Sequence, residues 1–399
     1  MRRLLVEIVS LTALVVLVSP LAASQTDQSA PQARAQAMID KALDYLKTQQ
    51  KPDGGWQREQ EPPGITALVL RCFVGAGRSP AGDASVRRGF DKLLSYQKPD
   101  GSIYQDILAN YNTAIAASAL AGAAENDPSI KAALDRAMGW LRKTQWVEGS
   151  IGPKGEKVED KANSWYGGFG YNRHSRPDLS NTHFAVQALH DAGVKPDDPA
   201  YRNVLVFVSR CQNFSETNDQ PWSGNDGGFV YSPADGGDSE AESYTGPDGR
   251  KMWRSYGSMT YAGLKSMIYA GLTPDDPRVK AAFDWVRQNW TLDENPGMRA
   301  NDPAQAQHGL YYYYQVMAKA LHAYGQPVLT DAQGKPHDWR LELIDKLASL
   351  QKPDGSWAGD KRWMEDNPVL ATSYVVLALQ EAQKDLKQHA ARNPATGGR

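Results

Sequence analysis

A short turn motif recurs along the chain and limits it to a repeat architecture. The strings KPDGGW (51–56), KPDGSI (98–103) and KPDGSW (352–357) each follow an amphipathic segment that ends in glutamine. Aligned on that residue, the chain divides into six units, whose equivalent positions are Gln50, Gln97, Gln145, Gln212, Trp290 and Gln351. The first units recur at about 47 residues, and the longer later spacings indicate inserted loops. Such a period predicts one supersecondary unit stacked on copies of itself.

Each unit contains two segments whose apolar residues follow the period of an α-helix. In the first segment, as in 38–46, one face is apolar and the other polar. The second segment is apolar or small on nearly all sides, which predicts burial all round. Asp-Pro pairs at 127–128, 198–199 and 276–277 place an N-cap residue before a proline suited to the first helical turn. The second segments cover 65–77, 112–124, 181–193, 255–271, 310–325 and 371–382.

Six helical hairpins can form either an open solenoid or a closed ring. The count of six favours the ring, as do the polar and aromatic residues near the N-terminal ends of the second segments. We therefore predict an all-α fold, an α/α toroid of twelve helices in an inner and an outer ring, with the inner N-termini around a central cavity. It forms a single domain over 33–383, and 384–399 is expected to be a flexible tail.

The N-terminus has the pattern of a secretory signal peptide. Arg2 and Arg3 precede an apolar run over 4–18, and small residues follow at 21–24. We expect residues 1–24 to be a signal peptide, 25–32 to be disordered, and the protein to be exported to a periplasmic or extracellular location. The alternative is an uncleaved membrane anchor.

Composition excludes several classes of protein. Lys and Arg number 44 against 46 Asp and Glu, and this balance argues against a nucleic-acid partner. Hydrophobic residues make up 41% of the chain, too few for a polytopic membrane protein, so we expect no integral membrane protein after cleavage. Cys72 and Cys211 lie in apolar helical segments and are expected to be buried thiols. We expect no metal and no cofactor.

The aromatic residues of the repeat turns have a structural explanation. Pro and Gly allow the chain to reverse after the helix, and an aromatic ring can cover the turn. We therefore expect clamps between units rather than ligand contacts at Trp56, Trp165, Phe169, Phe229 and Trp357.

These turns resemble the QW and prenyltransferase repeats of the squalene-hopene cyclase and protein-prenyltransferase superfamily. Segment 165–193 is similar to a prenyltransferase repeat, and segments 309–321 and 363–365 are similar to exported bacterial squalene-cyclase-like members. The resemblance covers nearly the whole chain after residue 33. It implies an α/α toroid and an enzyme acting on a polyisoprenoid or a similar apolar ligand.

The superfamily's usual catalytic motifs are missing from the sequence. There is no D-x-D-D acid, and the nearest strings, 196–199 and 274–277, are better explained as helix caps. In the zinc-dependent prenyltransferases an Asp-x-Cys pair holds the metal, whereas here the matching residues are Asp178 and Ser180. His183 lies two residues beyond the place expected for the histidine ligand. A zinc site of that kind is not expected.

Other chemistry-bearing residues gather near the N-terminal ends of the second segments. The four successive tyrosines at 311–314 point in all directions around a helix, so at least one or two should face the cavity. The alternative is an aromatic core that fills the ring centre. As catalytic candidates we take Asp178, His183, Asp302, His308 and Glu365. As cavity or ligand-binding candidates we take Tyr111, Tyr256, Tyr261, Tyr311, Tyr312, Tyr313, Tyr314, Trp363 and Tyr374.

Three functions remain open from the sequence. The first is an exported cyclase- or prenyltransferase-like protein that acts on or binds an isoprenoid-like ligand. The second is a non-catalytic toroid that binds a protein, glycan or lipid, with the polar insertions 150–161 and 232–254 framing its cavity. The third is a polysaccharide lyase or hydrolase, which requires two carboxylates, or a carboxylate and a base, across one cleft.

Overall fold

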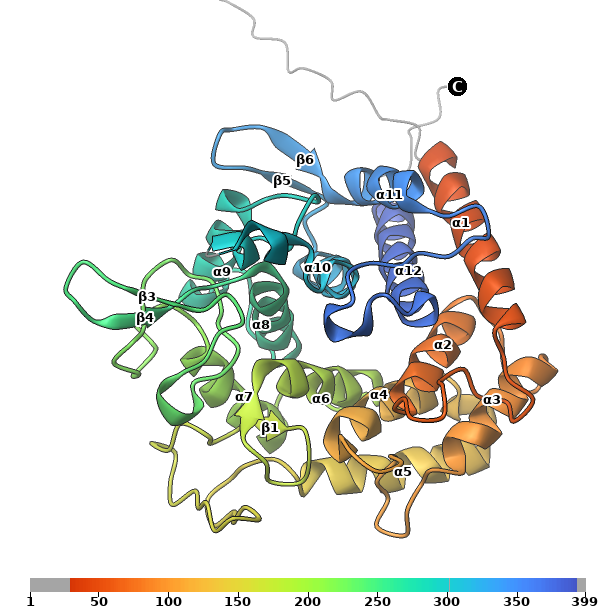
Figure 1. The fold of residues 1–399 in the computed structure, drawn as a ribbon, viewed down its shortest axis with the longest axis horizontal. Helices are drawn as coiled ribbons and strands as arrows, with labels where there is room; N and C mark the ends of the chain where they lie inside the picture. The colour runs from red at the N-terminus through yellow and green to blue at the C-terminus, as the bar shows by residue number, and fades with distance from the viewer. Residues whose placement is uncertain (1–28, 301, 393–399) are drawn as a thin grey trace, which may run out of the picture.

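The computed structural model describes residues 29–300 and 302–392, and it consists mainly of helices in two concentric rings (Figure 1). Within these residues there are twelve α-helices, which alternate along the chain between the outer and the inner ring. The outer helices are α1 (Ser29–Thr48), α3 (Ala84–Leu94), α5 (Pro128–Arg142), α7 (Pro199–Arg210), α9 (Pro277–Gln288) and α11 (Trp339–Leu350). The inner helices are α2 (Gly64–Gly75), α4 (Ala109–Ala121), α6 (Leu179–Asp191), α8 (Gly257–Tyr269), α10 (Leu310–Tyr324) and α12 (Pro368–Arg392).

The inner helices form a closed ring. Each packs against the next, from α2 to α4 and onward to α12, and α12 packs against α2. The predicted α/α toroid of six hairpins is confirmed, and the open solenoid is wrong. The loops add three antiparallel two-stranded ribbons, in which Phe169 pairs with Asp178, Tyr244 with Met252 and Leu329 with His337. Their strands are β1 (Phe169–Gly170), β2 (Pro177–Asp178), β3 (Ser243–Thr245), β4 (Lys251–Trp253), β5 (Val328–Thr330) and β6 (Pro336–Asp338).

The Asp-Pro pairs start outer helices as predicted. The Asp127 side chain accepts hydrogen bonds from the backbone N–H groups of Ser129 and Ile130, which have no partner inside the helix. Asp198 and Asp276 cap α7 and α9 in the same way, each with proline at the first helical position.

The repeated glutamine joins each unit to the next. Gln97 Nε2 donates to the Gly101 carbonyl of its own turn at 3.2 Å and to the Ala133 carbonyl in the following outer helix at 2.9 Å. The last of these residues, Gln351, reaches the Met38 carbonyl of α1 and so closes the ring. In the fifth unit the Trp290 indole donates to Glu342 of α11 instead. The equivalent bonds are made by Gln50, Gln145 and Gln212.

The aromatic residues at the five predicted positions are structural clamps, and four of them lie in the repeat turns. The Trp357 indole donates to the Leu347 carbonyl at 2.9 Å, and its backbone N–H donates to the Thr372 hydroxyl of the inner helix. Trp56, Phe169 and Phe229 are also buried and bond a threonine hydroxyl from their backbone N–H. Trp165, the fifth, lies before its turn: it packs edge-on against Trp146, and its indole joins two units by donating to Asp235 at 3.2 Å.

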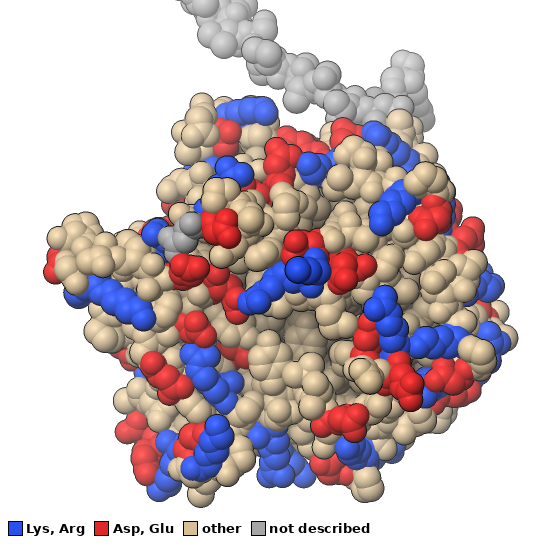
Figure 2. All heavy atoms as spheres, in the orientation of Figure 1, with Lys and Arg blue, Asp and Glu red and all other residues tan. Residues whose placement is uncertain are grey.

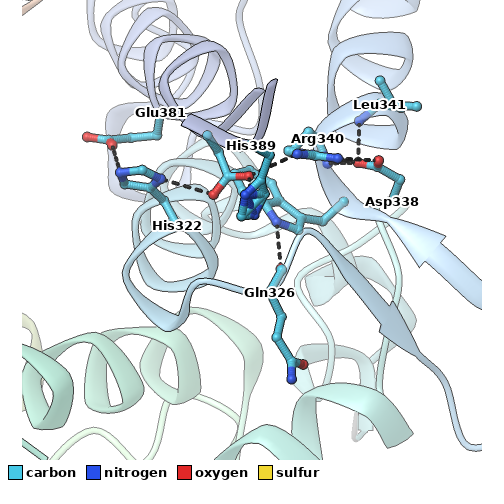
Figure 3. Close-up of polar contacts among 9 residues, drawn as sticks. His322, Gln326, Asp338, Arg340, Leu341, Glu381 and His389 are labelled. Atoms are coloured by element: carbon cyan, nitrogen blue, oxygen red, sulfur yellow. Dashed lines mark hydrogen bonds and ion pairs between the residues drawn. The ribbon is translucent and has the colours of Figure 1, made fainter. Parts of the chain in front are cut away.

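Two predicted boundaries are wrong. Residues 29–32 were expected to be disordered but form the first turn of α1, and α12 continues through residues 384–392 of the expected flexible tail. Burial explains the longer α12: Leu386 is fully buried, and Asp385 bonds His322 of α10 and Arg340 of α11, each at 3.1 Å. Figure 3 shows these two partners converging with His389 of α12. The expected signal peptide, residues 1–24, lies outside the described residues.

Charges of both signs are mixed over the face seen in Figure 2, which is hollowed near its centre. Cys72 and Cys211 are buried free thiols, as predicted. No helix in the part of the chain that the structure describes has the length and apolarity needed to cross a bilayer.

The close approach of each turn to the next outer helix gives a stability prediction. Gly101 has a φ of +97°, and a Cβ there would lie 2.3 Å from the Arg136 carbonyl oxygen, whereas Gly155 has a φ of +87° with nothing within 4 Å. We expect Gly155→Ala to cost about 1 kcal/mol from backbone strain alone. Gly101→Ala should cost about 2 kcal/mol more, because the helix must move away. Urea denaturation of both variants measures the difference, and equal losses would contradict the tight contact.

Candidate functional site

A cavity of about 220 Å³ lies where the N-terminal ends of the inner helices meet. All six inner helices contribute to its wall, as predicted, and the loops before α6, α8 and α12 complete it. The apolar part of the lining is made by Pro62, Ile65, Leu68, Leu108, Ile115, Met259, Met364 and Leu370. The remaining lining residues are Gly64, Tyr111, Asn112, Tyr171, Ser180, Tyr231, Glu240, Tyr256, Ser258, Tyr312, Trp363, Glu365 and Tyr374.

Tyrosine rings from different helices form the aromatic wall. Tyr312 of α10 lies 5.9 Å from the ring of Tyr374 of α12 in a T-shaped arrangement. Tyr111 of α4 lies 4.9 Å from Phe184 of α6 and 6.0 Å from Tyr171. Edge-to-face packing fixes the orientation of such rings. One cavity is lined by five of the predicted cavity residues: Tyr111, Tyr256, Tyr312, Trp363 and Tyr374.

Tyr171, Tyr231 and Glu240 also line the cavity, although the sequence analysis missed them. The hydroxyls of Tyr171 and Tyr231 lie 3.0 Å apart and join two loops across the cavity wall. Each tyrosine lies two positions after the phenylalanine of its repeat turn, Phe169 or Phe229. This shared offset could have identified both tyrosines from the sequence. Glu240 comes from the insertion 232–254, so that insertion does frame the cavity, whereas no residue of 150–161 lines it.

Only one of the four successive tyrosines faces the cavity. Tyr313 and Tyr314 are buried and donate their hydroxyls to the carbonyls of Thr291 and Leu292 in the preceding loop. Tyr311 packs against Tyr314, with ring centroids 6.0 Å apart. Tyr261, another predicted cavity residue, packs against Tyr313 between α8 and α10. For Tyr261, Tyr311, Tyr313 and Tyr314 the prediction is wrong, because the helix turns these side chains into its contacts with its neighbours.

Glu365 is the buried acid of the cavity, whereas Glu240 is partly exposed. Its carboxylate accepts the backbone N–H of Tyr312 at 2.7 Å and that of Tyr311 at 3.2 Å, at the first turn of α10. The residue is 1% exposed. Burial raises the pKa of Glu365 to about 8, although the two N–H groups act in the opposite direction. The side chain is therefore a neutral acid near pH 7 that is held beside the lumen.

Asp178 is a second buried acid, located outside the cavity lining. It caps α6, accepting hydrogen bonds from the backbone N–H and the side-chain amide of Asn181 at 2.7 and 2.8 Å. Burial raises the pKa of Asp178 to about 7. Besides capping the helix from behind the tyrosine wall, its carboxyl group interacts with the Tyr231 side chain of that wall, and this interaction opposes the rise in pKa.

His183 lies behind the same wall, within a chain of buried polar groups. Its Nε2 is 2.6 Å from the Tyr312 hydroxyl, and its Nδ1 is 3.0 Å from Lys265 Nζ. Lys265 in turn donates to Gln187, which donates to Asp191 at the far end of α6. Burial lowers the pKa of both His183 and Lys265. The nearby cations Arg71 and Lys319 lower both pKa values further, and Lys265 also lowers that of His183. His183 therefore positions Tyr312 rather than lining the cavity.

Asp302 and His308 do not join this site. Asp302 is exposed and caps the short helix Pro303–Gln307, and His308 lies 3.7 Å from Asp360. The ring of His308 faces that of Trp363 at 6.1 Å, near the rim. Within residues 29–300 and 302–392, no group of three or more His, Cys, Asp or Glu side chains is placed to hold a metal ion.

The raised pKa of Glu365 predicts how stability changes with pH. Between pH 4.5 and about 8 the folded protein holds a proton on Glu365 that the unfolded chain has lost, so the free energy of unfolding falls as pH rises through this window. Asp178 adds a fall of the same sign up to about pH 7. Glu365→Gln should make the decline shallower by about 1.4 kcal/mol per pH unit near pH 6.

Urea denaturation at several pH values measures this slope. The exposed Glu216 provides the matched control, because Glu216→Gln should leave the slope as it is in the wild type. Equal slopes in all three proteins would show that Glu365 is ionised in the folded state.

Residues 59–230 match the squalene-hopene cyclase C-terminal domain family. No curated protein matches the sequence. A type II terpene cyclase from Scytonema, in complex with geranylgeranyl dihydroxybenzoate, shares the fold with a TM-score of 0.55 and 16% identity, over 89% of this chain and 99% of that chain. The cellobiose 2-epimerase from Spirochaeta thermophila DSM 6192 has a TM-score of 0.58 and 12% identity, over 93% and 100% of the two chains. An inactive variant of an α-1,6-mannanase of Salegentibacter sp. HEL1_6, in complex with α-1,6-mannotetrose, has a TM-score of 0.54 and 10% identity, over 89% of this chain and 99% of that chain.

At these identities the solved structures establish the shared fold alone. Terpene cyclases and sugar enzymes both use this ring, so the ring does not identify the reaction. The superfamily resemblance inferred from the repeats is nevertheless confirmed by the sequence match. Residues 59–230 are thus similar in sequence to the squalene-hopene cyclase C-terminal domain, and most of the chain is similar in fold to a type II terpene cyclase.

Proposed function

We propose that the central cavity binds an isoprenoid-like apolar ligand and that Glu365 supplies a proton to it. The observation that carries this proposal is one buried carboxyl group, that of Glu365, in a cavity walled by tyrosine rings and aliphatic side chains. Apolar pockets with few polar groups bind apolar ligands and orient them by those groups. The terpene cyclase of the same fold holds a geranylgeranyl compound, which supports the ligand class.

The surroundings of Glu365 suit an acid that starts a reaction at a carbon–carbon double bond. The proton passes from the carboxyl group to one alkene carbon, and the other carbon takes the positive charge. The faces of Tyr312 and Tyr374 can stabilise that charge as aromatic rings stabilise other cations. The new carboxylate already has the N–H groups of Tyr311 and Tyr312 at the positive end of α10. Loss of a proton from the carbocation back to Glu365 completes an isomerisation or cyclisation.

A glycan ligand is the second candidate. Glu240 and Glu365 both line the cavity, and Trp363 and Tyr171 expose 40% and 38% of their surface near its opening. Two carboxylates and exposed rings are what a carbohydrate hydrolase uses. The epimerase and the mannanase of similar fold support this alternative. The apolar lining favours the isoprenoid, because a sugar would leave most of its hydroxyls without partners.

Blocking the cavity tests the ligand class. Ser180 lines the cavity, so Ser180→Trp should fill it and weaken binding of geranylgeraniol, measured by tyrosine and tryptophan fluorescence, by about tenfold or more. Ser349 is exposed on α11, and Ser349→Trp is the matched control that should bind as the wild type does. Binding of mannotetraose in place of the alcohol, blocked by the same variant, would overturn the isoprenoid proposal in favour of the glycan.

The role of Glu365 is tested by separating binding from reaction. Glu365→Gln should keep the affinity for a geranylgeranyl substrate within about threefold and lower product formation by at least about a hundredfold, followed by mass spectrometry. Glu240→Gln, the matched carboxylate of the same cavity, should keep most of the activity. Binding without any product in the wild type would leave the second function named above, a non-catalytic binding toroid.

We also propose that the protein is exported, with residues 1–24 as its signal peptide. The proposal is supported by the basic start, the apolar run and the small residues of that segment. Mass spectrometry of the N-terminus of the protein recovered from the source cell's periplasm or medium tests it. A mature chain that starts near residue 25 is expected, and a chain that retains residues 1–24 in a membrane fraction would contradict it.

A further inference from the structure

A second cavity, of about 380 Å³, lies at the opposite end of the ring, where the inner helices finish. Residues near the C-terminal ends of α2, α4, α6, α10 and α12 form its wall. Unlike the central cavity, it contains no aromatic side chain and many charged ones. Its lining residues are Arg71, Val74, Gly75, Ser118, Ala119, Ala121, Gly122, Asp191, Lys319, Leu377, Gln380, Glu381, Gln383, Lys384 and Lys387.

Positive charge exceeds negative charge in this second cavity. Two of its cations are buried and paired: Arg71 Nη2 lies 3.2 Å from Asp191 Oδ2, and Lys319 Nζ lies 2.7 Å from Glu381 Oε1. Two further lysines, Lys384 and Lys387, are exposed at the rim, where Lys384 Nζ lies 3.7 Å from Glu381 Oε2. Four cations against two carboxylates leave a surplus of two positive charges.

Two buried polar groups in this lining have no hydrogen-bond partner among the described residues. They are Arg71 Nη1 and Ser118 Oγ, on the neighbouring helices α2 and α4. Arg71 is 9% exposed and Ser118 5%. A buried donor without a hydrogen-bond partner is unfavourable, and more so when the group is charged. A ligand with oxygen acceptors would satisfy both donors.

The dipoles of the inner helices explain only part of the surplus positive charge in the second cavity. Cations near the C-terminal ends of helices are favourable, so some Lys and Arg are expected here without any ligand. Neutralisation of the dipoles does not account for donors that are buried and unpaired, or for the open volume beside them. We therefore propose that this second cavity binds a small oxyanion, a carboxylate or a phosphate, held by Arg71 and Ser118 with Lys384 and Lys387 at the rim.

Calorimetric titration of the full chain with inorganic phosphate, and separately with succinate, tests the proposal at constant ionic strength set by chloride. One equivalent of at least one anion should bind. Ser118→Ala should weaken binding about threefold, and Arg71→Lys, which keeps a cation beside Asp191, about tenfold. Together, Lys384→Gln and Lys387→Gln should weaken it about fivefold.

The matched control replaces two exposed lysines elsewhere, Lys143 and Lys195, by glutamine, and should bind as the wild type does. Ser180→Trp in the central cavity should also leave anion binding unchanged, so this result stands apart from the proposed function. No binding above the chloride background, or equal affinity in all the variants (an adventitious ion only), would overturn the proposal. Circular dichroism of each variant separates loss of binding from loss of fold.

Discussion

The ring depends on the side-chain amide of the repeated glutamine, which joins one hairpin to the next at five of the six contacts between successive hairpins. Each glutamine of the repeat satisfies a carbonyl of its own turn and a carbonyl of the next outer helix, as Gln97 does for Gly101 and Ala133. A single donor group thereby sets where the following hairpin begins. The glycine of the turn allows the approach, because any side chain there would meet the backbone of that helix. Repetition of this one joint around the ring brings α12 back to α2 and aligns all the inner helices in one direction.

Because the inner helices are aligned, the two ends of the ring differ chemically. Their N-terminal ends surround an apolar, tyrosine-lined cavity with one buried acid, Glu365, and their C-terminal ends surround a polar cavity rich in cations. Between them runs a hydrogen-bonded series of side chains, from Tyr312 through the buried His183, Lys265 and Gln187 to Asp191. Asp191 lines the second cavity and Tyr312 the first. The two cavities thus share one polar axis through an otherwise apolar centre.

The fold was predictable from the sequence because the repeat motif and the Asp-Pro pairs are short local patterns. The spacing of the motif gave the six units, and the pairs gave the helix caps at Asp127, Asp198 and Asp276. The site was predicted only in part. Sequence placed tyrosines at the right helix ends, but which of Tyr311 to Tyr314 faces the lumen depends on how α10 is rotated against α8 and α12. Glu240, Tyr171 and Tyr231 come from loops whose paths no period determines. Asp302 and His308 are close in sequence, but Asp302 caps the short helix beside it and His308 lies near Asp360 of a later loop.

The hydrogen bond from Gln351 to Met38, which closes the ring, also affects how the protein can unfold. In a linear array the two end repeats carry special polar faces, and a damaged end can fray while the rest persists. A ring has no end repeats, so every hairpin covers two neighbours and is covered by two. Opening any one joint would expose two apolar faces at once, on either side of the gap. Such a molecule should unfold as one unit rather than hairpin by hairpin, and a partly opened ring would present the surfaces that favour swapping of hairpins between chains.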